Sequence, residues 1–281
     1  MRLVFRSGMM QRSFGEEILS FVLARRKEDG GYGATPLLPA TVEDTYNALR
    51  ILETIGKTRG LKTLTAACRK DEALREYLIR SVETEWVSAR TTFQVLYSRR
   101  IVGLPLDESK ATAFLSYRPT KRLHLAERYY RARIVQEVLR KTTEKARKRP
   151  SPFTPLRWRT ASELWMRLYL ATAPATQESP VRAYLVSWFR ACQTSDGGFG
   201  FLPGTTSYVE NCHTCLRALA FLNALPKYPE ACLHFLLACR TGGGGFARNS
   251  GAAPFLDATW HAVATWAILE NTMSHLGKSV A

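Results

Sequence analysis

The sequence predicts an all-α fold built from about six helical hairpins. The first observation is a glycine-rich turn that occurs three times, as DGGYG (29–33), DGGFG (196–200) and GGGGF (242–246). The second is a helical pattern before and after each turn, with apolar residues three or four positions apart. The third is a hydrophobic content of 46%, with 11% aromatic residues, which suffices for a sizeable core.

The three turns belong to one repeated unit. The segments SFVLARRKEDGGYG (20–33), SWFRACQTSDGGFG (187–200) and HFLLACRTGGGGFA (234–247) align without a gap. In each, an aromatic residue is followed five positions later by Arg26, Gln193 or Arg240, and then by glycines and a second aromatic residue. A match of this length in three places indicates an internal repeat.

Each turn is followed by an extended loop and a second helix, predicted at residues 42–56, 209–223 and 257–271. Thr45, Cys212 and Thr259 lie fourteen residues after the glycine that precedes the aromatic residue of each turn (Gly31, Gly198 and Gly245), which sets a common register. An acidic residue stands in the first turn of each helix, where the helix dipole favours it. We expect these three helices to form an inner layer, with their N-termini at one end of the molecule.

The middle of the chain continues the hairpins. The predicted helices are residues 71–82 and 86–103, 110–117 and 123–141, and a segment ending in 159–174 after the proline-bounded loop 147–155. Hairpins of about 45 residues can close into a ring with the second helix of each pair inside, leaving a central cavity. An open helical solenoid is the alternative.

The 281 residues are predicted to form a single domain, 1–281. We expect no membrane span, because no run of about 18 apolar residues occurs. The N-terminus lacks the long apolar region of a secretion signal. The six cysteines lie mostly inside apolar helical patterns, which is typical of a reduced, cytoplasmic protein.

Positive charge is concentrated in one region. The chain has 40 basic and 24 acidic residues, and Arg118 to Arg159 holds fourteen basic residues against three glutamates. Such a field favours an anionic partner, such as a diphosphate, an acidic protein, a nucleic acid or a membrane surface. Of these we expect a diphosphate or an acidic protein, and no nucleic acid. The densest part, KTTEKARKR (141–149), is interpreted as a solvated face.

The repeated unit resembles a known family. Its pattern of aromatic, four residues, Gln or Arg, three residues and Gly-Gly-aromatic is similar to the QW motif of squalene and terpene cyclases. With VEDTYNAL (42–49), it also resembles the repeat of protein prenyltransferase β subunits. The resemblance implies a six-hairpin α/α toroid. It further implies an apolar, aromatic-lined cavity that takes an isoprenoid chain. We expect this cavity to open at the end that carries Glu43, Glu210 and Asp257, because the first-turn acids of the inner helices face the same rim.

The resemblance to prenyltransferases implies a Zn²⁺ site. In that family the metal is bound by an Asp, by a Cys two residues later and by a His on the next inner helix, and it holds a thiol as thiolate. Glu210 and Cys212 match the first two positions, and His261 matches the third if WHAVATWAIL is aligned on the family pattern. The chain's own repeat register puts Ala258 there instead. The other interpretation is that Cys212 and Cys215 are core residues.

The resemblance to terpene cyclases implies a carboxylic acid that protonates an alkene. The nearest match to their D-x-D-D motif is TVED (41–44), which lacks the first Asp. Candidate acids are Glu43, Asp44 and Asp257, and helix capping is the competing role for the first two. Asp257 is also the expected partner of His261, because it lies four residues earlier on the same helical face.

The diphosphate of a prenyl substrate needs basic partners. The loop GFGFLPGTTSYVEN (198–211), which carries them in the family, has none here. Candidates in the basic region are Arg128, Arg131, Arg157 and Arg159, since guanidinium groups bind phosphate oxygens in pairs. Among the tryptophans, Trp260 is a candidate to line the pocket or to stabilise a carbocation, as are Trp158, Trp165 and Trp266.

Three functions follow from these residues. The first is a zinc-dependent prenyltransferase that moves a prenyl group from a prenyl diphosphate to a thiol or similar acceptor. The second is a terpene-cyclase-like enzyme acting on a prenyl diphosphate or terpenoid. The third is a non-catalytic toroid that binds a lipid or a protein. Bound zinc, a cyclised product, or tight binding without either would distinguish them.

Overall fold

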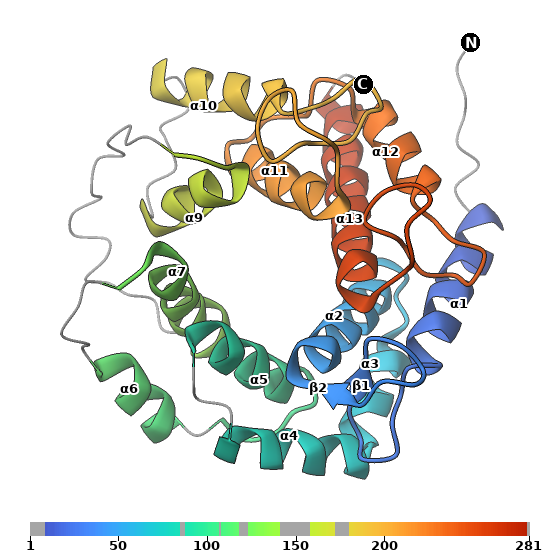
Figure 1. The fold of residues 1–281 in the computed structure, drawn as a ribbon, viewed down its shortest axis with the longest axis vertical. Coiled ribbons are helices and arrows are strands. Elements are labelled where there is room, and N and C mark those ends of the chain that lie inside the picture. The colour runs from blue at the N-terminus through green and yellow to red at the C-terminus, as the bar shows by residue number, and fades with distance from the viewer. Residues whose placement is uncertain are drawn as a thin grey trace.

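A computed structural model describes residues 9–84, 88–106, 108–117, 123–140, 158–171 and 180–279. Within these residues the chain forms two concentric layers of helices around a central axis (Figure 1). The inner layer consists of α2 (Val42–Thr58), α5 (Ala89–Ile101), α7 (Leu125–Arg133), α9 (Ala161–Ala171), α11 (Val209–Phe221) and α13 (Leu256–Ser279). The outer layer contains α1 (Met9–Leu23), α4 (Glu72–Thr84), α6 (Glu108–Ser116), α10 (Pro180–Ala191) and α12 (Pro229–Ala238).

The ring is closed. Each inner helix packs against the next, from α2 through α5, α7, α9 and α11 to α13, and α13 packs against α2. This contact excludes the open solenoid and confirms the six-hairpin α/α toroid, because a closed ring buries the apolar face that each hairpin would otherwise expose. The predicted inner helices at 42–56, 209–223 and 257–271 all lie in the inner layer.

The described residues also form four elements in addition to the helices of the two layers. An additional helix, α3 (Lys62–Lys70), follows α2, and a π-helical turn, η1 (Ile134–Val138), extends α7. Two short strands, β1 (Tyr32–Gly33) and β2 (Ala40–Thr41), pair in the first glycine loop. The proline-bounded loop 147–155 and the basic segment 141–149 lie outside the described residues.

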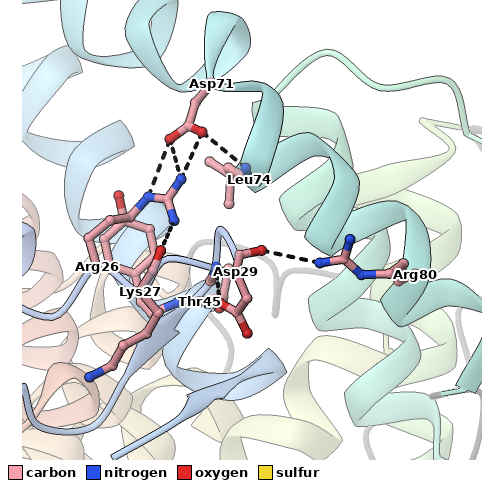
Figure 2. Close-up of polar contacts among 9 residues, drawn as sticks. Arg26, Lys27, Asp29, Thr45, Asp71, Leu74 and Arg80 are labelled. Atoms are coloured by element: carbon pink, nitrogen blue, oxygen red, sulfur yellow. Dashed lines mark hydrogen bonds and ion pairs between the residues drawn. The ribbon is translucent and has the colours of Figure 1, made fainter. Parts of the chain in front are cut away.

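In the three units that carry it, the repeated turn holds the hairpin to the next one. Arg26, at the end of the first unit's outer helix, binds both carboxylate oxygens of Asp71, with Nη2 at 2.7 Å from each (Figure 2). Asp71 also accepts the backbone N–H of Leu74 and so caps the start of α4. Gln193 occupies the same place in its unit. It donates to the carbonyl of Tyr228 and accepts its N–H, both at 2.9 Å, at the start of α12.

The glycines permit this close approach. Gly30, Gly197 and Gly244 have φ of +102°, +89° and +86°, a conformation that side chains disfavour. A Cβ on them would lie 1.9 to 2.3 Å from a backbone carbonyl oxygen of the next outer helix. In the last unit that oxygen belongs to Glu17 of α1, so the third turn joins the end of the repeat array to its beginning.

Candidate functional site

The inner helices enclose a cavity of about 460 Å³. All the inner helices that the structure describes contribute to its walls. The same positions recur on each helix, counted from its first residue, because the helices are parallel and in register. A first-turn residue of one helix contacts a first-turn residue of its neighbour, as Glu43 contacts Arg90, and a third-turn residue contacts a third-turn residue, as Arg50 contacts Tyr97. The walls can therefore be described in layers.

The first-turn layer is polar. Glu43 of α2 forms an ion pair with Arg90 of α5, and Asp257 of α13 also faces the cavity. The side chains of Glu43 and Arg90 are 48% and 54% exposed, so this end of the cavity is in contact with solvent.

The second-turn layer is an aromatic collar. The fifth residue of every inner helix carries an aromatic ring that lines the cavity: Tyr46, Phe93, Tyr129, Trp165, His213 and Trp260. Neighbouring rings meet at edge-to-face geometry, as for Tyr46 and Phe93 (centroids 5.9 Å apart) and for His213 and Trp260 (5.5 Å). Trp165 Nε1 donates a hydrogen bond to the hydroxyl of Tyr129.

A histidine pair lies between α11 and α13, formed by the collar residue His213 and by His261 of α13. The Nδ1 atoms of His213 and His261 lie 2.8 Å apart, so one ring donates to the other. Burial, with the nearby His261, Arg217, Arg50 and Arg133, lowers the pKa of His213 well below its ordinary value. Burial also lowers the pKa of His261 to about 4, although Asp257 opposes the shift. Both imidazoles are therefore neutral at pH 7.

The third-turn layer contains three arginines. The ninth residues of α2, α7 and α11 are Arg50, Arg133 and Arg217, which we call the arginine layer, and all three line the cavity. Each guanidinium lies over the collar ring of the preceding inner helix. Its distance to the ring centroid is 4.4 Å for Arg50 over Trp260, 3.9 Å for Arg133 over Phe93 and 4.9 Å for Arg217 over Trp165.

The three arginines differ in their acidic partners. Arg133 makes a two-pronged ion pair with Glu137, with N–O distances of 2.7 and 2.8 Å. Arg50 Nε lies 3.5 Å from Glu53, a carboxylate that also binds Lys57. Arg217 has no hydrogen bond or ion pair to any of the described residues.

The electrostatics show that the arginines act on common neighbours. Burial alone would raise the pKa of Glu137, yet its pKa is lowered by the hydrogen bond from Arg133 and by the charges of Arg133, Arg217 and Arg50. The same three arginines contribute to the lowered pKa of His213. The arginine layer is thus a region of positive potential inside the ring.

These layers correct the prediction of a predominantly apolar cavity. Charged and polar side chains alternate with rings on its walls, and aromatic residues supply most of the hydrophobic surface. The physical reason is that the outer faces of the inner helices already pack against the outer layer and form the core. The inward faces are therefore free to carry polar side chains.

The structure does not bring together Glu210, Cys212 and His261, the predicted zinc ligands. Glu210 binds Arg248, with Oε1 2.5 Å from Nη2. Cys212 is fully buried and accepts the backbone N–H of Phe199, and burial with a hydrogen bond to Cys232 raises its pKa well above the ordinary value. Across the ranges that the structure describes, no group of three or more His, Cys, Asp or Glu side chains is arranged to hold a metal ion.

The repeat explains the position of Cys212. In the equivalent positions, Thr45 accepts the N–H of Tyr32 and Thr259 accepts the N–H of Phe246, each at 3.0 Å. Cys212 does the same with Phe199, so its side chain faces the glycine turn and not the cavity. The chain's own repeat register, and not the alignment on the zinc family, describes this site.

Of the three candidate acids, two line the cavity and one does not. Asp257 and Glu43 line the cavity, whereas Asp44 does not. Asp44 accepts a 2.6 Å hydrogen bond from the Thr41 hydroxyl at the helix start, and burial raises its pKa. Asp257 does not orient His261, whose Nδ1 binds His213 instead, while Asp257 Oδ1 accepts the N–H of Ala258.

Of the predicted diphosphate-binding arginines, the three that the structure describes do not line the cavity. Arg131 turns toward the outer layer, where Nη1 donates to the carbonyls of Leu115 and Tyr117 at 3.2 and 3.1 Å. Arg128 and Arg159 are exposed, and Arg157 lies outside the described residues. Trp260 does line the cavity, as predicted for a substrate-binding ring.

Sequence reasoning missed the arginine layer. A signal was present, since an aromatic residue followed by arginine four positions later occurs at Tyr46–Arg50, Tyr129–Arg133 and His213–Arg217. Residues four apart lie on one helix face, so each pair points into the ring together. The density of charge between residues 118 and 159 drew attention to Arg128, Arg131, Arg157 and Arg159 instead of to Arg133 in the same region.

Comparison with known proteins agrees with this architecture. The family model described as the prenyltransferase alpha-alpha toroid domain matches residues 4–94 and 212–280, more than half of the chain. The protein therefore belongs to the family of prenyltransferase α/α toroid domains. No curated protein matches the chain significantly. Among the described residues, no helix has the length and hydrophobicity needed to cross a membrane.

Proposed function

We propose that the protein is an enzyme that binds a prenyl diphosphate in its central cavity and breaks the bond between the prenyl carbon and the diphosphate oxygen. The observation that carries this proposal is the direct stacking of the arginine layer on the aromatic collar. The two layers provide the two kinds of group that such a reaction needs, a cationic partner for the leaving group and aromatic faces for the carbon skeleton.

The chemistry follows from charge. As the C–O bond breaks, the diphosphate takes the electron pair and the prenyl group becomes an allylic cation. Guanidinium groups stabilise the growing negative charge, and ring faces such as those of Trp260 and Phe93 stabilise the cation. The cavity volume of about 460 Å³ is in the usual range for a small-molecule site.

The reaction then ends in one of two ways. A nucleophile of an acceptor attacks the cation and loses its proton, which is prenyl transfer, or a double bond of the prenyl chain attacks it and a proton leaves, which is cyclisation. The neutral His213–His261 pair beside the collar is the available proton acceptor. The proposal includes no zinc step, because Glu210, Cys212 and His261 do not fit a common metal position.

The test is incubation of the purified protein with prenyl diphosphates of ten, fifteen and twenty carbons, with and without a thiol acceptor, followed by mass spectrometry. We expect release of diphosphate and a prenylated or cyclised product. Trp260→Leu should lower the rate about tenfold, the value of one desolvated cation–π contact. Phe255→Leu, at an exposed ring outside the cavity, is the matched control.

Two results would contradict the proposal. If prenyl alcohols of the same chain lengths bind as tightly as the prenyl diphosphates, the arginines take no part in recognition. If the diphosphates bind tightly but remain intact under all conditions, the protein is a non-catalytic isoprenoid-binding toroid.

A further inference from the structure

We propose that the arginine layer is an anion-binding site for a diphosphate or phosphate ester, so that the ligand enters the ring with its anionic group first. The hydrocarbon part then lies at the aromatic collar and extends toward the first-turn end. The anion site stands on the geometry of Arg50, Arg133 and Arg217, and the identity of the hydrocarbon part rests on the proposed function.

The first support is the common depth of the three side chains. Each is the ninth residue of its helix, and each lies four residues, or about 6 Å, beyond the collar. The three helices, α2, α7 and α11, alternate with α5, α9 and α13 around the ring (Figure 1). Three donors of equal depth therefore line the same cavity from alternate helices, and guanidinium groups bind phosphate oxygens in pairs.

The second support is unbalanced charge. Three guanidinium groups share the cavity wall with Glu137, and only Arg133 forms an ion pair with it. Arg50 has a buried Nε without a hydrogen bond, and its neighbour Glu53 is shared with Lys57 and lies 3.9 Å from Arg100. Arg217 has no acidic partner among the described residues. Buried like charges repel, and a bound anion relieves that repulsion.

The third support is preorganisation. Each guanidinium is fixed over a collar ring, so its position does not have to be selected when the ligand binds. Arg50 and Arg133 are largely withdrawn from water, with side-chain exposures of 16% and 8%. Hydrogen bonds to an anion are stronger in such surroundings than at a surface.

The first-turn layer disfavours the opposite orientation. Its arginine, Arg90, is already paired with Glu43, and Asp257 adds a second carboxylate. An anionic group held at this end would face two acids and one neutralised cation. The field therefore directs the anion past the collar to the arginine layer.

The test uses inorganic diphosphate as the probe and isothermal titration calorimetry as the measurement. We expect wild-type protein to bind it, and Arg217→Gln to weaken binding about 10- to 100-fold, the value of one charged hydrogen bond. Arg248→Gln, which removes an exposed arginine outside the cavity, should bind as the wild type does.

A stability measurement keeps the result interpretable. Arg217→Gln leaves no carboxylate without its partner and removes one of three repelling charges. Its midpoint of urea unfolding without ligand should therefore be equal to or above that of the wild type. Added diphosphate should raise the wild-type midpoint and leave that of the variant nearly unchanged.

The outcomes separate this inference from the proposed function. A larger loss of diphosphate binding in Arg90→Gln than in Arg217→Gln places the anion at the first-turn end and overturns the inference. Absence of diphosphate binding by the wild type also overturns it. Diphosphate binding that depends on Arg217, without tighter binding of any prenyl diphosphate, keeps the inference and refutes the proposed function.

Discussion

At the scale of single residues, the same side-chain type serves different purposes according to its place in the repeat. Cys212 resembles a metal ligand in the sequence, yet it replaces a threonine that holds the glycine turn. His213, its neighbour, points the other way and joins the collar. One residue along a helix turns a side chain by about 100°, so neighbours in the chain can face the core and the cavity.

The histidine pair should make stability depend on pH. Because the folded pKa of His261 is about 4, below its unfolded value near 6.5, the unfolded chain binds the proton first as the pH falls. Stability should be unaffected above pH 7 and should fall by up to about 3 kcal/mol between pH 6.5 and 4. In His261→Gln the free energy of unfolding should lose this part of its pH dependence, which urea unfolding at pH 7, 5.5 and 4.5 would measure.

The control for this prediction is His234→Gln, at an exposed position on α12. It should keep the wild-type pH dependence. An unchanged slope in His261→Gln would show that the imidazole is not held neutral in the ring. Asp257, Arg217 and Arg90 surround His261, so the variant should be measured at fixed ionic strength.

At the scale of elements, one polar residue of each glycine turn attaches its hairpin to the next. The attachment has two chemical forms, Arg26 with the Asp71 carboxylate and Gln193 with the Tyr228 backbone. Asp71 and Tyr228 both stand immediately before an outer helix, α4 or α12. The two forms are therefore alternatives at one structural position, and Figure 2 shows the form made by Arg26 and Asp71.

Exchanging the two forms tests this equivalence. Gln193→Arg should destabilise the protein by about 1–2 kcal/mol, because arginine cannot accept the Tyr228 N–H and finds no acid. The double variant Gln193→Arg/Tyr228→Asp should recover about 1 kcal/mol of this loss. Gln193→Arg/Tyr228→Asn, which lacks the charge, is the control in the same chemical unfolding measurement. Equal stability of the two double variants would refute an Arg–Asp contact.

The helices and turns could be predicted from the sequence more fully than the residues of the site. The glycine turns and the helical period predicted the inner helices, because Gly30, Gly197 and Gly244 are required by contacts that any ring of this kind must make. The inward-facing residues obey no such requirement. Arg50 and Arg217 occupy positions where closure of the ring sets no preference for polarity, so only the helix register, once known, identifies them.

At the scale of the whole molecule, the ring closes through the contact of the third glycine turn with α1. Gly244 approaches Glu17, and Arg240 forms an ion pair with the Glu17 carboxylate. Arg240 and Glu17 are 223 residues apart in the sequence, so this contact closes a loop that contains most of the chain. A closed ring has no terminal repeat that can unfold without disturbing both neighbours.

Gly244→Ala should therefore weaken the entire ring. A Cβ there would lie 2.3 Å from the Glu17 carbonyl oxygen, in addition to the strain of φ +86°. Gly251→Ala is the matched control, since Gly251 has φ +83° with nothing within 4 Å of a Cβ, and it should cost only the strain of about 1–2 kcal/mol. Gly244→Ala should cost more in urea unfolding.

The shape of that transition is a second readout. Tryptophan fluorescence and far-ultraviolet circular dichroism should shift together in Gly244→Ala, as in a single cooperative unit. Separate transitions would indicate that the repeats unfold independently, as they do in open solenoids.

The attachment of the hairpins and the lining of the cavity use different side chains. Attachment depends on the turns and the outer layer, and lining depends mainly on the second, fifth, sixth and ninth positions of the inner helices. Mutations in one set therefore meet few constraints from the other, which makes the ring a scaffold on which new substrate preferences can evolve or be designed. Substituting Arg217, the ninth residue of α11, would change the charge of the cavity without leaving a buried carboxylate unpaired, so the architecture should stay in place.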